Sequence, residues 1–130
     1  MTKTTAVRKL IRELLNTVFP DDQLYEGFNN GTEIPKVNYK LVFQSNVDSR
    51  DDIQLEINIW TKDSLKADQI ADSIEDCLNF RSVVRYGCYM TMYMDSRKNI
   101  DEKNDLERRM MTFSIENYYK EVSNETNTEK

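Results

Sequence analysis

Apolar residues near the start of the chain recur at the spacing of a helix. The repeat consists of Val7, Leu10, Ile11, Leu14, Leu15 and Val18. Steps of three and one residues place these side chains on one stripe of a helix with 3.6 residues per turn. Thr4 or Thr5 can cap the start of this helix. Pro20 predicts that it ends by Phe19, because the residue before a proline avoids helical dihedral angles.

A strict alternation of apolar and polar residues follows and predicts two strands. The first alternation carries Val37, Tyr39, Leu41 and Phe43, and the second carries Ile53, Leu55, Ile57 and Ile59. A period of two over this length is typical of a strand with one buried face. Residues 45–52 are mostly polar, and we expect them to form a solvent-exposed loop that joins an antiparallel pair. Residues 23–27 predict a short strand, and residues 29–31 a turn.

The second half of the chain predicts one helix and two further strands. Ser64 can cap the helix, whose buried stripe would consist of Leu65, Ala67, Ile70, Ala71, Ile74 and Leu78. Strands are expected over residues 83–94 and 108–118. Residues 95–107 are rich in charge and predict a long, solvated connection between these strands. Residues 120–130 contain one apolar residue, and we expect this tail to be disordered.

The order α-β-β-β-α-β-β predicts an α+β fold. We expect one mixed or mainly antiparallel sheet of four to five strands, with both helices on one face. The chain has 130 residues and a mass of 15.4 kDa, which suits one domain. We assign residues 1–119 to that domain and 120–130 to the tail.

Composition narrows the classes of function. The chain contains no histidine, which excludes histidine-activated nucleophiles and histidine metal sites. Cys77 and Cys88 match neither a zinc spacing nor a CxxC redox pair. The formal charge of −5 disfavours binding to nucleic acid, whose affinity depends on phosphate contacts. Apolar runs are too short for a membrane helix. We therefore expect no enzyme activity, no cofactor, no metal and no membrane partner.

Asp68, Asp72 and Glu75 lie on one side of the second predicted helix, opposite its buried stripe. Like charges at these spacings destabilise a helix by about 0.2–0.5 kcal/mol per pair. This face is either simply solvated or it binds a partner or a metal ion. The first predicted helix carries the opposite charge, through Lys3, Arg8, Lys9 and Arg12. The two charged surfaces either lie side by side in one monomer or complement each other between copies in a head-to-tail ring.

The strand predicted over residues 83–94 carries large side chains on both faces. Met90, Met92 and Met94 alternate with Tyr89 and Tyr93. The methionines fit a core beneath the helices, although methionine also builds adaptable contact surfaces. Two helices can cover only one face of a sheet, so we expect the tyrosine face to be covered by another subunit. Trp60, at a strand end, is a further candidate anchor for an interface.

The chain resembles the small tail terminator, or tail completion, proteins of long-tailed bacteriophages. The resemblance rests on the order of four segments spread over most of the chain and on the pattern of residue types within them. They are the opening helix at 7–19, the strand KVNYKL at 36–41, the segment LEINIWTKD at 55–63 with ADQIAD at 67–72, and the strand RRMMTFSI at 108–115.

The resemblance implies a virion assembly protein without enzyme activity or cofactor. Such a protein forms a ring, commonly of six copies, that caps the tail tube, ends its polymerisation and provides the surface on which the head docks. Its partners would be further copies of itself, the tail tube protein and a head-completion or connector protein. It would lie at the head-proximal end of the tail, after assembly in the host cytoplasm, and viral DNA would pass through without specific binding.

The resemblance itself provides no interface residues. From the residues alone, the candidates are those named above: Arg8, Arg12, Trp60, Asp68, Asp72, Glu75, Tyr89 and Tyr93. Two alternatives remain open. One is a head–tail joining or stopper protein of the same virion. The other is a cytosolic ligand-binding regulatory domain, which predicts a pocket between the helices and the sheet.

Overall fold

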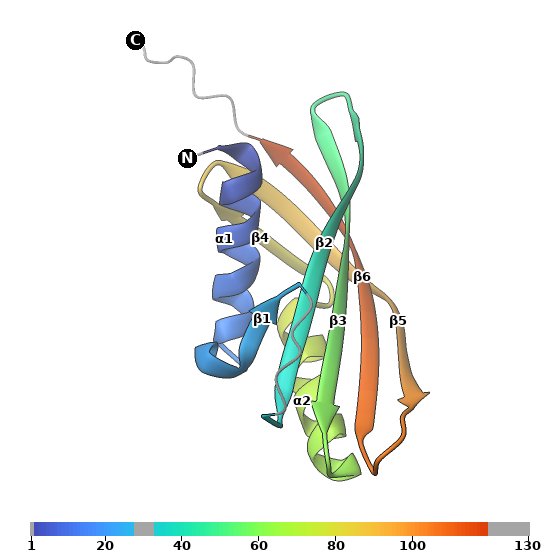
Figure 1. The fold of residues 1–130 in the computed structure, drawn as a ribbon. Coiled ribbons are helices and arrows are strands. Elements are labelled where there is room, and N and C mark those ends of the chain that lie inside the picture. The colour runs from blue at the N-terminus through green and yellow to red at the C-terminus, as the bar shows by residue number, and fades with distance from the viewer. Residues whose placement is uncertain (1, 28–32, 120–130) are drawn as a thin grey trace.

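The computed structural model describes residues 2–27 and 33–119 (Figure 1). One six-stranded sheet carries two helices. The elements in chain order are α1 (Lys3–Asn16), the 3₁₀ helix η1 (Asp21–Gln23), β1 (Leu24–Glu26), β2 (Lys36–Val47), β3 (Arg50–Thr61), α2 (Ser64–Leu78), β4 (Arg81–Arg85), β5 (Cys88–Asp101) and β6 (Glu107–Tyr119). The strands lie in the order β1-β2-β3-β6-β5-β4, and only β1 and β2 are parallel.

The α+β class and the mainly antiparallel, mixed sheet are confirmed, but the predicted strand number is too low. The sheet has six strands rather than four or five. The short strand expected at 23–27 is present as β1. The turn predicted at 29–31 and the disordered tail predicted at 120–130 lie outside the described residues.

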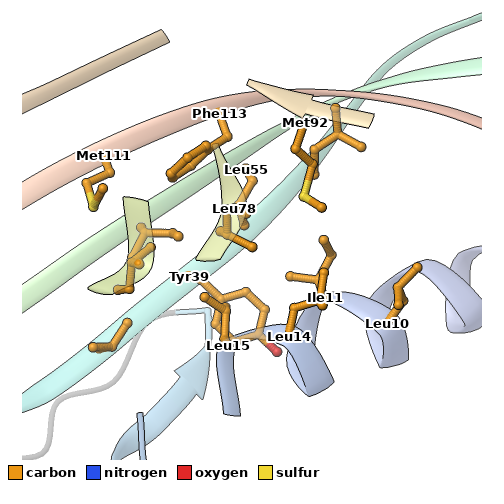
Figure 2. Close-up of a cluster of buried hydrophobic side chains, with 14 of the residues drawn as sticks. Leu10, Ile11, Leu14, Leu15, Tyr39, Leu55, Leu78, Met92, Met111 and Phe113 are labelled. Carbon is orange, nitrogen blue, oxygen red and sulfur yellow. The ribbon is translucent and has the colours of Figure 1, made fainter. Parts of the chain in front are cut away.

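Both helices lie on the same face of the sheet, as predicted (Figure 1). The reason is the alternation along the central strands: Leu55 and Ile57 of β3 and Met111 and Phe113 of β6 are fully buried on this face. The stripes of both helices join these side chains in one core cluster, and Figure 2 shows Leu14 and Leu15 of α1 near Tyr39 of β2. Met90 and Met92 are buried here as well, so these two methionines belong to the core.

The helix caps differ from the predicted ones by one to three residues. Thr2, rather than Thr4 or Thr5, caps α1 by accepting a hydrogen bond from the amide of Thr5. Asp63, rather than Ser64, caps α2 by accepting one from the amide of Leu65. Leu65 itself is 64% exposed, so it does not belong to the buried stripe as expected. It lies in the first turn of the helix, beyond the edge of the core.

Two tight turns correct the predicted loops. Asp48 and Ser49 have φ values of 54° and 67°, and Tyr86 and Gly87 have 55° and 78°. Positive φ at both central residues is the signature of a type I′ hairpin turn, whose twist matches that of the flanking strands. The first turn lets β2 and β3 run on through most of the predicted loop at 45–52. The second divides the strand predicted at 83–94 into β4 and β5.

The predicted long connection at 95–107 is also wrong, because β5 continues to Asp101. The register between β5 and β6 shifts between Met94 and Ser96 and then resumes. Beyond the shift, the Ser96 hydroxyl lies 2.7 Å from the Thr112 hydroxyl, and Arg97 reaches α2. A strand can carry the charged residues of this segment because their side chains find partners on neighbouring elements, as Arg97 does on α2.

The carboxylate of Glu13 ties α1 to the β4–β5 turn. It accepts hydrogen bonds from the Tyr86 hydroxyl at 2.5 Å and from Arg85 at 3.1 Å. The Lys9 ammonium lies 4.6 Å from the centre of the Tyr86 ring. The hydrogen bond from Tyr86, followed by Arg85 and then Lys9, lowers the pKa of Glu13 below its ordinary value of 4.5. Above pH 4.5 the carboxylate of Glu13 is therefore charged, and in this form it stabilises the junction.

We expect Tyr86→Phe to destabilise the protein at pH 7 and to do so less as the pH falls. The stabilisation from a lowered carboxyl pKa is present above the ordinary value and is lost as the pH falls through the lowered one. Urea unfolding at pH 7, 4.5 and 3 measures the difference from the parent protein.

Tyr25→Phe is the matched control, because the Tyr25 hydroxyl donates to the uncharged carbonyl oxygen of Asp22. Its effect should not change with pH in the same way. A Tyr86→Phe effect of constant size across this range would contradict the assignment to the Glu13 charge.

Candidate assembly surface

The sheet face opposite the helices is the candidate functional surface. No element in the described part of the chain packs across it (Figure 1). It carries the less buried half of each alternation in β3 and β6. At one end, five residues from five strands lie side by side. We call them the cross-sheet row; in order from β2 to β4 they are Val47, Arg50, Tyr118, Tyr89 and Val84.

The cross-sheet row presents aromatic and aliphatic side chains to solvent. Tyr89 is 42% exposed, and Tyr118 and Val84 are exposed still further. Tyr93 lies on the same face, four residues along β5 from Tyr89, and is also exposed. Arg50 is held in the row by an ion pair of 2.9 Å with Asp52. Tyrosine and arginine are enriched among the anchors of protein interfaces.

A second cluster lies toward the other end of the open face, around Trp60. Lys36 and Arg108 are the cross-strand neighbours of Trp60 on its two sides. The Lys36 ammonium lies 5.6 Å from the Trp60 ring centre, and the Arg108 guanidinium carbon lies 4.8 Å from it. Such cation–π contacts contribute about 0.5–1 kcal/mol each at exposed sites. They hold the half-buried indole between its two cross-strand neighbours.

Arg108 is itself fixed in position. It donates two hydrogen bonds, of 2.9 and 2.7 Å, to the side-chain oxygen of Asn58 and forms an ion pair of 3.3 Å with Glu102. A hollow of about 340 Å³ opens beside this cluster, over β2 and β3. The cluster thus offers a preformed surface whose side chains lose little freedom when a partner binds.

The predicted charged interface residues form ion pairs inside this chain. Arg8 of α1 pairs with Glu26 of β1. Arg12 pairs with Asp21 at 2.9 Å and donates to the carbonyl oxygen of Leu24 at 2.8 Å. These contacts fasten α1 to η1 and to β1.

The acids of α2 contact arginines from the sheet. Arg97 pairs with Asp72 at 2.7 Å and with Glu75 at 2.9 Å, and Arg109 pairs with Asp68 at 2.8 Å. In these pairs the acids of α2 meet arginines of the sheet, whereas Arg8 and Arg12 of α1 meet β1 and η1. The row of like charges on α2 is thereby explained without a metal or a second subunit. A role of these residues between copies remains a prediction.

Arg109 is the structural residue that sequence reasoning missed. It is 2% exposed on the helix-facing side of β6, where it also donates to Ser64 at 2.9 Å and pairs with Glu107 at 3.0 Å. Its position in the alternation, in phase with Met111 and Phe113, is the signal that could have placed it on the buried side. Val84 and Val47 were also missed as members of one surface, since only the register across the sheet brings them together.

No group of three or more potential metal ligands is found among residues 2–27 and 33–119. In the same described ranges, no helix has the length and apolar character needed to cross a membrane.

Among the comparisons with known proteins, only the one with solved structures gives a match. No protein-family model matches the sequence, and no curated protein matches it significantly. Among solved structures, a chain from the structure titled "Virion of native gene transfer agent (GTA) particle" has the same fold. The two chains are 17% identical, with a TM-score of 0.62, over 88% of this chain and 93% of that one. At this identity the likeness establishes a shared fold over nearly the whole length.

We expect Tyr89→Ala to change the free energy of unfolding of the monomer by less than about 1 kcal/mol, because the side chain is substantially exposed. Ile57→Ala in the core is the comparison, with an expected loss of about 2–5 kcal/mol. Denaturant unfolding of dilute protein measures both. An equal loss for both variants would show that Tyr89 supports the monomer's core and would remove it from the candidate surface.

Proposed function

We propose that this chain is a structural virion protein: a tail terminator that forms a ring on the end of the tail tube. The ring ends polymerisation of the tube and offers the surface on which the head docks. The observation that carries this proposal is the likeness to a chain of a gene transfer agent virion particle, which extends over nearly the full length of both chains. The sequence resemblance to tail terminators agrees with it.

The bare sheet face supports an assembly role. It carries the cross-sheet row and the Trp60 cluster, whereas both helices pack against the other face. Exposed aromatic side chains beside fixed arginines are the composition from which interface anchors are made. A ring needs two different surfaces on each copy, and this single-layer sheet offers two unlike edges and one open face.

The proposed partners follow from this role. They are further copies of the chain, six in the ring, the tail tube protein and a head-completion or connector protein. The protein would act without catalysis or cofactor at the head-proximal end of the tail, after assembly in the host cytoplasm. The ligand-binding alternative predicts a pocket between helices and sheet, whereas the hollow beside Trp60 lies on the opposite side of the sheet.

Loss of this protein in its parent virus should give tails longer than normal that do not join heads. Complementation with the intact gene should restore the normal length, which electron microscopy of negatively stained tails measures. Antibody against the protein should label one end of isolated tails. Normal tail lengths in its absence, with labelling of tail-free heads, would contradict the terminator role and favour the head–tail joining protein.

We also expect the purified protein not to retain duplex DNA. A net charge of −5 per copy, repeated around a ring, repels the phosphate backbone, so DNA can pass without being held. Filter binding at low salt is the most sensitive test, since electrostatic attraction is strongest there. Tight binding that weakens steeply with added salt would contradict this expectation and indicate a nucleic-acid-binding role.

A further inference from the structure

The two edges of the sheet each leave a strand without a neighbour. In the described part of the chain, β4 pairs with β5 alone, and β1 covers β2 only from Val37 to Tyr39. The distal half of β2 therefore has a free outer edge, like β4. Free edges present unpaired backbone groups that accept another strand.

The two free edges lie at the same position along the direction of the strands. Following the cross-strand partners from Val84 leads through Tyr89, Tyr118 and Arg50 to Val47. The same path leads from Ser82 to Ser45 and from Val83 to Asn46. These are three series of cross-strand partners. The register shifts in β2 and β5 both lie on one side of them, so each series runs unbroken across all five strands. A rotation about an axis along the strands thus brings the β4 edge of one copy level with the β2 edge of the next.

The two edges also match in direction and in side chains. Successive antiparallel pairings from β2 through β3, β6 and β5 make β4 run parallel to β2. Val84 and Val47 are exposed on the same face, at 65% and 53%. Phe80, directly before β4, is 81% exposed. Monomers seldom leave such apolar side chains uncovered along a free strand edge.

We propose that β4 of one copy adds in parallel to the distal half of β2 of the next copy, so that the sheet continues from subunit to subunit around the ring. This inference rests on the proposed ring and specifies its interface. Val84 of one copy then lies beside Val47 of its neighbour, and each shields the other from water. The surface is heterologous, which is the kind of contact that closes into a ring.

Charge disfavours the symmetric alternative, in which two β4 strands pair with each other. Arg81 and Arg85 lie on the same face of β4, and an antiparallel pair centred on Val83 would place the Arg81 of each copy opposite the Arg85 of the other. Like charges directly opposite each other destabilise a strand pair. The β2 segment from Ser45 to Val47 is uncharged and imposes no such cost.

Paired cysteines test the interface. We would mix Val47→Cys protein with Val84→Cys protein, both in a Cys77→Ser background that removes the partly exposed native thiol. Oxidation should join one chain of each kind, because cross-strand neighbours lie within the reach of a disulfide. Within one copy the two positions are four strand spacings apart, about 19 Å along the sheet, so one chain carrying both cysteines can form this disulfide only with another copy.

Val42→Cys is the matched control for Val47→Cys. It lies on the same face of β2, but it is level with Tyr93, beyond the end of β4. Mixed with Val84→Cys, it should give at least ten-fold less cross-linked product. Equal yields from positions 42 and 47, or a product from Val84→Cys alone at the yield of the mixture, would overturn the proposed register.

A second variant distinguishes a failure of the proposed interface from a failure of the proposed ring. Val84→Lys places a charge on the β4 edge and should abolish assembly of concentrated protein in sedimentation velocity. Leu65→Lys, at 64% exposure on α2, should assemble like the parent. Rings that form without the 47–84 disulfide and despite Val84→Lys would overturn this interface and leave the terminator role standing. Failure of the parent protein to assemble, alone or on isolated tails, would overturn both.

Discussion

The structure depends on burying one face, and only one face, of a single sheet. Along β3 and β6 every second side chain is removed from water, from Leu55 and Ile57 to Met111 and Phe113. Because the side-chain period of a strand is two, a slip of one residue would exchange the buried and the exposed sets. The hydrophobic core thereby fixes the register of the strands. The same register determines which side chains stand together on the bare face.

Charged residues reinforce this arrangement from within the chain. Arg97 and Arg109 extend from the sheet to the acids of α2, and Arg12 and Glu13 fasten α1 to η1 and to the β4–β5 turn. Exposed ion pairs contribute little energy individually, about 0–1 kcal/mol. Their positions nevertheless orient both helices over the core. With these charges engaged inside the monomer, the bare face and the free edges become the stronger candidates for contact between copies.

The sequence predicts the regular parts of this fold and misses those that depend on turns or on register. The helix stripes and the alternations of β2 and β3 follow directly from apolar spacing. The β4–β5 hairpin was missed because its turn contains Tyr86, an aromatic residue that is unusual at positive φ. The far half of β5 was missed because its charges resemble those of a loop, although Arg97 has partners on α2.

The candidate surface was predictable only in part. Trp60 and Tyr89 stand out by residue type and by their place on strands, and the structure puts both on the bare face. Val47 and Val84 are ordinary valines far apart in sequence, and no local pattern connects them. Their relation emerges only when the pairing of β2, β3, β6, β5 and β4 is followed from one edge of the sheet to the other.

Amide hydrogen exchange in dilute and in assembled protein tests the central claim most directly, namely that copies join through the free edges of the sheet. Outward-facing amides of β4 and of the distal half of β2 are unpaired in the monomer and would gain hydrogen bonds in the ring. The account predicts that assembly slows exchange in these two segments, around residues 82–85 and 45–47, while the centre of β3 is unchanged. Protection confined to α1 and α2, with both edges still exchanging freely, would contradict it.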